Sequence, residues 1–370
     1  MSEQTTSRDA VLSARPIEEV MDRRVYGRIM AALTHQEPDR VPIWDLIDSW
    51  PTFEHFASGE TDPISANVKV YNGLAIDLCR GLYMPADPAS EGRQFDGGNH
   101  KSKMSGLTCW MVEYPIKTLD DVRAWRCDPL TEEQVWAEAE HIVRIRDALA
   151  PQTMYVPGRG MGFHEAYGMM GLAPFCLALH DAPEQIERII DTLNARSCVH
   201  AKVYAEANIC PMYFIGDDIA YKGRTMFSLQ TLRELFFPYL KRMCEPLVNA
   251  GIEVIYHTDG YIMDIIDDLL DCGVSGLNPL EPLAGNDIAA IKKRYGDNLV
   301  LVGGMDCSQL LPLGSPQDVR EGVKQLLREA GHSGGLFIGS SSEIVPATPL
   351  ENILTFYEAC QEFGRYPLQV

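Results

Sequence analysis

Short apolar runs alternate with longer segments of helical periodicity through most of the chain after residue 118. The apolar runs lie at 154–157, 212–215, 253–256, 274–277, 299–302 and 336–338, and the helical segments lie near 131–149, 165–180, 183–208, 228–250, 261–272, 286–295, 316–330 and 349–363. Strands that are buried on both faces read as continuous apolar runs, and their alternation with helices is typical of a parallel sheet. This part of the chain therefore predicts an α/β fold.

The N-terminal part supplies the remaining strands of a closed barrel. The run at 41–45 predicts another buried strand, and a run near 74–78 could supply the last of the eight strands of a (β/α)₈ barrel. Residues 1–21 are expected to be a flexible N-terminal segment, and residues about 50–117, with Pro, Gly and Asp punctuation, are interpreted as an insertion or lid. We therefore predict one TIM barrel over residues 22–370 with an N-terminal elaboration.

Polar residues follow each predicted strand directly. In a (β/α)₈ barrel the residues that act on substrate lie at the C-terminal ends of the strands, which meet at one rim. These first polar residues are mostly Asp, His, Arg and Asn, with Gly and Ser, whereas ordinary surface loops would scatter Lys and Glu. They include Asp45, Arg159, His164, Asp217, Asp218, His257, Asp259, Asn278, Asp306 and Glu343. The pattern predicts an active-site cleft at the barrel mouth.

His257 is the strongest catalytic candidate at this rim. It follows a strand directly and precedes Asp259 by two residues, and residues i and i+2 of an extended segment point the same way. The predicted catalytic residues are therefore His257, Asp218 and Asp259, and the predicted substrate-binding residues are Asp45, Arg159, His164, Asn278 and Asp306. The structural alternatives are a core histidine at position 257 and turn or helix-cap roles for Asp217, Asp218 and Asp259.

The chain is strongly acidic, with 52 acidic and 32 basic side chains among 370 residues and a net charge of -20. Such a surface repels phosphate backbones and anionic lipids, so we expect neither nucleic acid nor membrane as a partner. The 10 cysteines are scattered without a C-x-x-C pair, which predicts reduced thiols in a cytoplasmic protein. The N-terminus has no apolar core of a secretory signal, and no apolar run approaches the roughly 20 residues that cross a bilayer.

Several short motifs lie at the predicted strand ends. They are Gly216-Asp217-Asp218, Tyr256-His257-Thr258-Asp259-Gly260, residues 276–282, Gly303-Gly304-Met305-Asp306 and residues 346–352, with Arg40-Val41-Pro42-Ile43-Trp44 near the start. Together they resemble the uroporphyrinogen decarboxylase superfamily over residues about 22–365, which implies the barrel fold. True uroporphyrinogen decarboxylases carry an arginine-rich R-Q-A-G-R-Y segment after the first strand, and it binds the substrate's carboxylates. Here Asp45 and Asp48 occupy that place, so like charges would meet and uroporphyrinogen is rejected as the substrate.

The chain is most similar to the cobalamin-dependent methyltransferase branch of this superfamily. Thiol-methylating members of the branch bind zinc through a His-x-Cys pair and a later Cys. His257 matches the histidine, while Asp259 and Ser342 stand in place of the cysteines. Because serine is a weak ligand, Glu343 is the replacement, and the predicted metal ligands are His257, Asp259 and Glu343. Oxygen ligands are harder than thiolates and suit an oxygen-bearing substrate.

The resemblance implies transfer of a methyl group from a small methylated donor, by preference a methoxy compound, to a corrinoid protein that supplies the cobalamin. Cobalt would be the nucleophile, and a bound zinc ion or a protonated His257 would polarise the leaving heteroatom. One alternative is decarboxylation of a small carboxylic acid, with Arg159 pointing inward and holding the carboxylate. Another is a non-catalytic binding protein. The sequence leaves the donor, the partner and the oligomeric state open.

Overall fold

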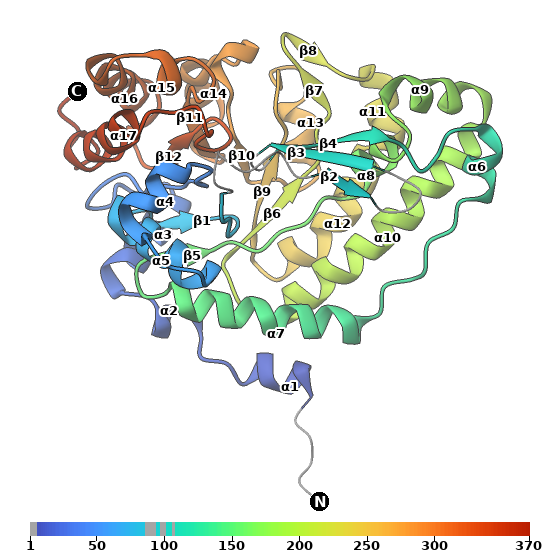
Figure 1. The fold of residues 1–370 in the computed structure, drawn as a ribbon, viewed down its shortest axis with the longest axis horizontal. Coiled ribbons are helices and arrows are strands. Elements are labelled where there is room, and N and C mark those ends of the chain that lie inside the picture. Colours follow the sequence, from blue (N-terminus) through green and yellow to red (C-terminus); the bar gives the residue numbers. More distant parts are fainter. Residues whose placement is uncertain (1–5, 86–93, 97–100, 106–107) are drawn as a thin grey trace, which may run out of the picture.

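A ring of parallel strands forms the centre of the protein, which a computed structural model describes over residues 6–85, 94–96, 101–105 and 108–370 (Figure 1). Among these residues, five strands form one parallel sheet in the order β12-β11-β10-β9-β6. They are β6 (Met212–Gly216), β9 (Glu253–His257), β10 (Gly276–Asn278), β11 (Val300–Met305) and β12 (Leu336–Ser340). A second parallel pair consists of β1 (Leu78–Cys79) and β5 (Met154–Tyr155).

Isolated bridges join these two sheets into a closed barrel. The extended segment 41–44 lies between β12 and β1, and Gly158, in the segment that follows β5, lies against β6. The bridges are Ile43 with Ile338, Trp44 with Leu78, and Gly158 with Phe214, all parallel. Segment 41–44 therefore acts as the first strand, and the predicted (β/α)₈ barrel is confirmed.

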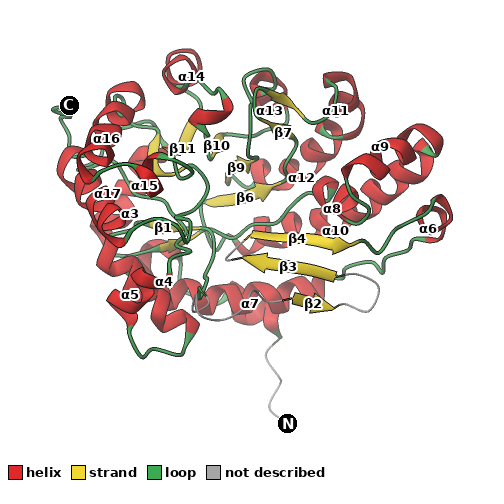
Figure 2. Ribbon diagram, turned by 45° about the horizontal axis from the view of Figure 1, so that its top comes forward, coloured by secondary structure: helices red, strands yellow, loops and turns green. Residues whose placement is uncertain are grey.

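Helices surround the ring on its outer side (Figure 2). They are α4 (Trp50–Ala57), α5 (Pro63–Leu74), α7 (Glu132–Leu149), α8 (Phe163–Gly168), α9 (Leu172–Asp181), α10 (Pro183–Ala207), α11 (Leu229–Leu235), α12 (Phe237–Asn249), α13 (Ile266–Asp271), α14 (Ile288–Tyr295), α15 (Leu310–Leu313), α16 (Pro316–Ala330) and α17 (Leu350–Phe363). Capping boxes mark the N-terminal ends of two of these helices: Thr131 and Gln134 form one on α7, and Ser315 and Asp318 form one on α16. Such boxes satisfy backbone N–H groups that have no partner within the helix.

Two apolar layers hold the strands and helices together. The first fills the barrel with side chains from around the ring, namely Trp44, Leu78, Met154, Val156, Met212, Phe214, Ile255, Val300, Val302 and Phe337. Two N-terminal helices, α2 (Ile17–Val20) and α3 (Arg23–Leu33), add Ile17, Val25 and Ile29 to this layer and so close one end of the barrel. The second layer lies between strands and outer helices. The C-terminal mouth is left as the accessible end.

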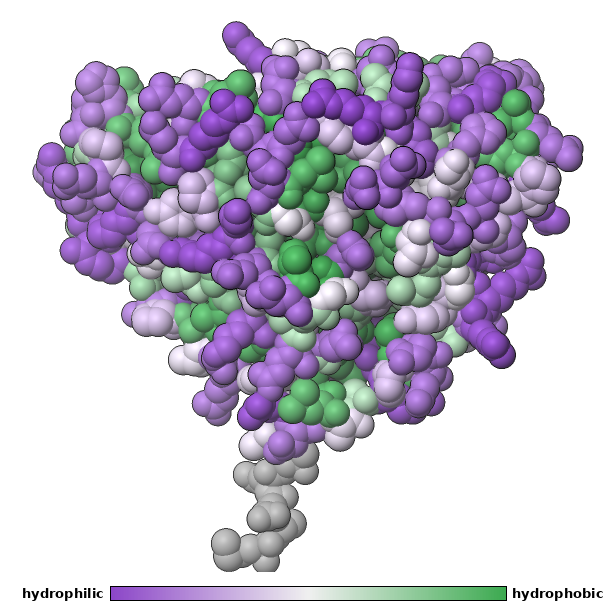
Figure 3. Space-filling model, turned by 180° about the vertical axis from the view of Figure 1, so that it is seen from behind, coloured by the Kyte–Doolittle hydropathy of each residue, from purple (hydrophilic) through white to green (hydrophobic). Residues whose placement is uncertain are grey.

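The surface agrees with the acidic composition. Figure 3 shows a mainly hydrophilic face with small apolar patches between polar side chains. In the described part of the chain, no helix combines the length and the apolar content that spanning a membrane requires.

The N-terminal segment differs from the flexible segment that was expected at 1–21. From Thr6 onward it contains α1 (Ser7–Leu12) and α2, and α1 packs against α7 (Figure 1). Val11 and Met21 are buried. A few apolar anchors among many polar residues therefore order this stretch, although the average composition is polar. Residues 1–5 lie outside the described residues.

The insertion is shorter than the predicted range of about 50–117. Helices α4 and α5 belong to the outer layer of the barrel, and because α5 continues to Leu74, the strand predicted near 74–78 lies at Leu78–Cys79. The inserted part follows β1 and holds an antiparallel sheet of β2 (Gln94–Asp96), β3 (Lys101–Ser105) and β4 (Thr108–Glu113), followed by α6 (Leu119–Ala124). It leaves from the C-terminal end of β1 and so belongs to the mouth side of the barrel.

A buried ionic network ties the first two strands to α3. The Asp77 carboxylate, 2% exposed, accepts hydrogen bonds from Arg28 Nη1 at 2.6 Å and from Arg40 Nη1 at 2.7 Å. It also accepts the backbone N–H of Ile43 at 2.7 Å. One carboxylate thus links segment 41–44, the approach to β1, and the helix that closes the barrel.

Replacing Asp77 by alanine should lower the free energy of unfolding by about 3 kcal/mol, because Arg28 and Arg40 would lose their shared buried counter-charge. Urea unfolding followed by circular dichroism measures this loss. Asp267→Ala is the control, because it removes an ion pair with Arg294 in which both side chains are 67% exposed. The control should cost less than about 1 kcal/mol. Equal losses in the two variants would contradict the role given to the network.

Candidate functional site

Three predicted catalytic residues meet at the barrel mouth. His257 ends β9, Asp259 follows it by two residues, and Asp218 follows β6 by two residues. Each offers one ligand atom, and these atoms all lie within 4.8 Å of one another. The Asp259 backbone N–H donates to Asp218 Oδ1 at 3.1 Å, which ties the two strand ends together. One imidazole and two carboxylates therefore face the same point.

The orientation of the His257 ring is set by Asn278 at the end of β10. The His257 Nδ1 atom lies 2.6 Å from Asn278 Oδ1. Because an amide oxygen can only accept, Nδ1 carries the proton and Nε2 keeps its lone pair, 3.8 Å from Asp259 Oδ1. Burial, together with the charge of Arg80, lowers the pKa of His257 to about 4. The imidazole is therefore neutral at pH 7, which favours a ligand or base over a protonated acid.

The carboxylates at the mouth repel one another. Desolvation, followed by the charges of Asp218, Glu281 and Glu343, raises the pKa of Asp259 to about 7. Clustered acids of this kind are stabilised by a cation that all of them can reach. His164 faces the cluster, with Nδ1 3.5 Å from Asp218 Oδ2, and its ring stacks on Tyr167 at 4.8 Å. The predicted position of His164 beside the site agrees with this contact.

A cavity of about 360 Å³ opens beside these residues. Its lining residues are Arg80, Tyr155, Gly158, Arg159, Gly160, His164, Phe214, Gly216, Asp218 and His257. The Phe214 ring is part of the apolar filling of the barrel and lies 5.3 Å from the His257 ring. The cavity thus combines a polar rim with an apolar floor, as small-molecule sites commonly do.

Arg80 is a site residue that the sequence reasoning missed. Its guanidinium lies 5.3 Å from the centre of the Phe214 ring, and its charge acts on His257. It is the first polar residue after β1, so the rule applied to the other strands would have found it. The strand had been placed too early, near 74–78.

Glu343, one of the predicted metal ligands, lies outside the cluster of possible ligand atoms in the described residues. Its Oε2 lies 3.5 Å from Arg80 Nη2 and accepts a hydrogen bond from Ser342 Oγ at 2.7 Å. Glu343 is therefore paired with Arg80, which lines the cavity. In the described residues Asp218 takes the third position beside His257 and Asp259. The ligand set that we propose below therefore contains Asp218 in place of Glu343, beside His257 and Asp259.

Asp45 and Asp306 have structural partners instead of facing the cavity. Asp45 is 2% exposed and accepts hydrogen bonds from Ser340 and from Tyr357 Oη at 2.8 Å. Burial raises the pKa of Asp45 to about 6. Asp306 accepts backbone N–H groups at the start of α15, including that of Leu310 at 2.9 Å. Both were expected to bind substrate, but their oxygens are already used to join β12, α17 and α15.

Asp217 has a structural role, which the sequence left as an alternative to a role in the site. It is buried and accepts the backbone N–H groups of Met161 and His164, so it anchors the loop after β5 to β6. Burial raises the pKa of Asp217 to about 7. The neighbouring Asp218 is left to face the mouth.

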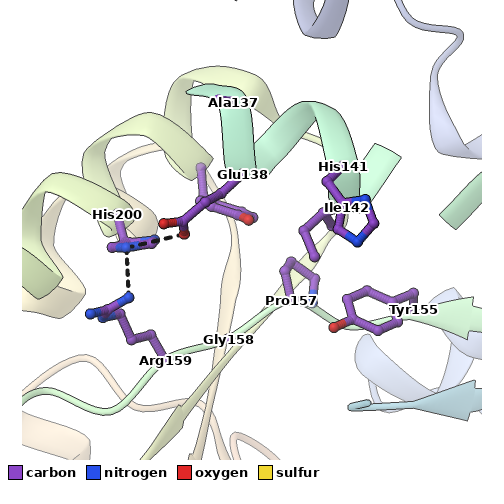
Figure 4. Close-up of a pocket in the computed structure, with 10 residues that line it drawn as sticks. Ala137, Glu138, His141, Ile142, Tyr155, Pro157, Gly158, Arg159 and His200 are labelled. Carbon is purple, nitrogen blue, oxygen red and sulfur yellow. Dashed lines mark hydrogen bonds and ion pairs between the residues drawn. The ribbon is translucent and has the colours of Figure 1, made fainter. Parts of the chain in front are cut away.

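Arg159 points away from His257. Its guanidinium Nη1 lies 2.8 Å from His200 Nε2 on α10, on the outer side of the ring (Figure 4). Val156, three residues before Arg159, points into the barrel. Because the side chains of an extended segment alternate between its two faces, Arg159 points to the opposite side. The expected inward guanidinium is supplied by Arg80 instead.

Known proteins resemble this chain over most of its length. The family described as "Uroporphyrinogen decarboxylase (URO-D)" matches residues 103–363. A methylcobamide:CoM methyltransferase, MtaA, from Methanosarcina barkeri is 25% identical over 349 residues, covering 91% of this chain and 97% of that protein. A uroporphyrinogen decarboxylase from Coxiella burnetii is 31% identical over 78 residues, which is 21% of each chain.

A solved structure shares the fold. A methyltransferase from Methanosarcina mazei aligns with a TM-score of 0.66 and 20% identity, covering 92% of this chain and 98% of that one. This likeness supports the barrel found here through its bridges. The family match spans more than half of the sequence, including β6, β9 and the mouth residues. The chain therefore belongs to the uroporphyrinogen decarboxylase family.

Proposed function

We propose that this protein transfers a methyl group between a small methylated compound and a corrinoid carried by a partner protein, with zinc held by Asp218, His257 and Asp259. The cluster of three ligand atoms within 4.8 Å carries the proposal. The similarity to a methylcobamide:CoM methyltransferase over 91% of the chain supports the reaction class. The cytoplasmic location stays a prediction from the cysteine pattern.

The residues at the mouth fit a zinc ion. Zinc accepts His nitrogen and carboxylate oxygen ligands, and catalytic zinc sites combine three protein ligands with one open position. The hydrogen bond from His257 Nδ1 to Asn278 leaves Nε2 available, as the supporting residues of metal-bound histidines commonly do. Zinc bound there would polarise the heteroatom that carries the methyl group.

The chain's own side chains define the surroundings of the transferred group. Asn278, 4% exposed, fixes the imidazole, and Phe214 provides an apolar floor below it. His164 lies beside the cluster, with Nδ1 3.5 Å from Asp218 Oδ2. Because the ligands are oxygen and nitrogen without thiolate, we infer an oxygen-bearing, methoxy donor rather than a thioether.

Decarboxylation of a small acid has less support. That reading requires the Arg159 guanidinium to point into the cavity, whereas Arg159 contributes to the cavity wall and its guanidinium bonds to His200 outside the ring. Arg80 does face the cavity, but it is opposed by Glu343 at 3.5 Å. The mouth is therefore better arranged for a cation than for an additional carboxylate.

The purified protein should bind one zinc ion per chain, and Asp218→Ala, His257→Ala and Asp259→Ala should each lose it. Elemental analysis after dialysis measures the zinc content. Glu343→Gln is the matched control at the same cavity and should keep the metal, because Glu343 pairs with Arg80. Loss of zinc in Glu343→Gln with retention in Asp218→Ala would restore the original ligand set and reject the corrected one.

Zinc affinity should rise with pH between about pH 6 and 8. A proton competes with the metal for a ligand carboxylate, and the pKa of Asp259 lies at about 7. His257, with a pKa of about 4, stays neutral through this range and adds no further dependence. Titration with zinc in a competing chelator at several pH values measures the slope. Asp259→Asn should bind more weakly and with a flatter pH profile; an unchanged profile would refute the assignment.

His257→Ala should abolish methyl transfer while leaving the fold nearly intact, because a rim residue removes little core packing. Losses of such charge stabilisation amount to about 3 kcal/mol, or roughly a hundredfold or more in rate. The test measures the thermal midpoint and the methylation of a reduced corrinoid protein by a methoxy donor. His180→Ala, with an exposed side chain on α9, is the control. A strongly lowered midpoint with near-normal specific activity would identify His257 as a core residue instead.

A further inference from the structure

A second cavity, of about 460 Å³, lies outside the barrel wall between α7, α10 and the segment that follows β5 (Figure 4). Its lining residues are Ala137, Glu138, His141, Ile142, Tyr155, Pro157, Gly158, Arg159, His200 and Tyr204. We name it the side cavity. The catalytic residues Asp218, His257 and Asp259 are absent from its lining, although Tyr155, Gly158 and Arg159 line both cavities, so the side cavity adjoins the mouth cavity without containing the catalytic residues.

The guanidinium of Arg159 provides positive charge in the side cavity. Within the described residues its side chain forms one hydrogen bond, to His200 Nε2 at 2.8 Å, and no ion pair. His200 is 4% exposed, and burial together with the Arg159 charge lowers the pKa of His200 to about 4. The imidazole is therefore a neutral acceptor. It orients the guanidinium without neutralising it, and several N–H donors stay unused.

Two tyrosine hydroxyls add further donors. Tyr204 is 6% exposed, and neither it nor Tyr155 has a hydrogen-bond partner for its hydroxyl among the described residues, although both line the cavity. Burial raises the pKa of Tyr155 to about 12 and that of Tyr204 above its usual value, so both keep their protons. A cavity ligand with oxygen acceptors would supply a partner for each hydroxyl.

One carboxylate, Glu138, opposes this positive charge. Its Oε2 lies 3.5 Å from His200 Nε2, and its side chain is 51% exposed. It therefore stands at the solvent edge on α7, where it can turn outward, while Arg159, Tyr155 and Tyr204 belong to the wall behind it. Among the charged side chains that line the cavity, Arg159 therefore supplies the positive charge of the inner wall.

We propose that the side cavity binds the oxyanion group of a small molecule, a carboxylate or a phosphate, with Arg159 as the charged anchor and the hydroxyls of Tyr155 and Tyr204 as further donors. A planar guanidinium bonds such groups through paired N–H donors. The cavity volume admits a small metabolite and excludes a macromolecule. The inference does not depend on methyl transfer, because neither zinc nor a corrinoid takes part.

Isothermal titration of the full-length protein with inorganic phosphate and with acetate tests the inference. Saturable binding of at least one probe is expected. Arg159→Gln should weaken it at least about tenfold, since hydrogen bonds to charged groups are the stronger class. Arg233→Gln is the matched control, because Arg233 is exposed and pairs with Asp268 elsewhere. It should bind as the unmodified protein does.

Two further variants keep the test decisive if Arg159→Gln fails to fold. Tyr204→Phe retains the ring and should weaken binding roughly threefold, the loss of one neutral hydrogen bond. Glu138→Gln removes the opposing charge and should strengthen binding. If neither probe binds the unmodified protein saturably, or if neither Arg159→Gln nor Tyr204→Phe weakens binding, the inference is overturned.

Discussion

Closure of the parallel ring is the constraint on which the rest of the molecule depends. Because every strand runs in the same direction, all C-terminal ends meet at one rim, and residues far apart in sequence become neighbours. The weakest places of the ring are segment 41–44 and the seam after β5, which are held by isolated bridges. Buried carboxylates reinforce them: Asp77 below, Asp45 between the first and last strands, and Asp217 at the seam. Asp45, which was expected to bind substrate, therefore helps to hold the barrel closed, together with Asp77 and Asp217.

The same geometry explains why like charges repel one another at the mouth. Carboxylates that lie after different strands are brought together at the mouth, and of the two arginines in the lining of the mouth cavity, Arg80 and Arg159, it is Arg80 whose charge acts on His257 and Asp259. His257 sits among these carboxylates with its pKa lowered, while the pKa of Asp259 is raised. Opposite shifts at adjacent groups produce one neutral nitrogen ligand, His257, beside the Asp259 carboxyl group, whose proton a metal ion must displace.

The sequence predicts the barrel and the rim because both follow from local patterns. Apolar runs locate the strands, and the residue after each run lies at the mouth, which found Asp218, His257, Asp259 and Asn278. The direction of each side chain is a different matter, since it depends on the phase of a strand. Because the second strand lies a few residues later than the sequence predicted, Arg80 was not among the predicted site residues. The Arg159 side chain faces outward. Hydrogen-bond partners from distant elements, such as Tyr357 for Asp45, are likewise invisible along the chain. That is why two expected substrate contacts proved structural.

The single bridge between Gly158 and Phe214 has a mechanical consequence. Tyr155, Gly158 and Arg159 line both the mouth cavity and the side cavity, so this short segment, which begins at the end of β5, forms the wall that the two cavities share. A Cβ atom at Gly158 would collide with the Phe214 carbonyl, so a residue larger than glycine does not fit at this position. Whatever displaces this strand from outside also shifts the ring of Phe214, which is the floor beneath His257. The two cavities therefore share part of their wall, and a ligand that moves this wall from one cavity changes the shape of the other.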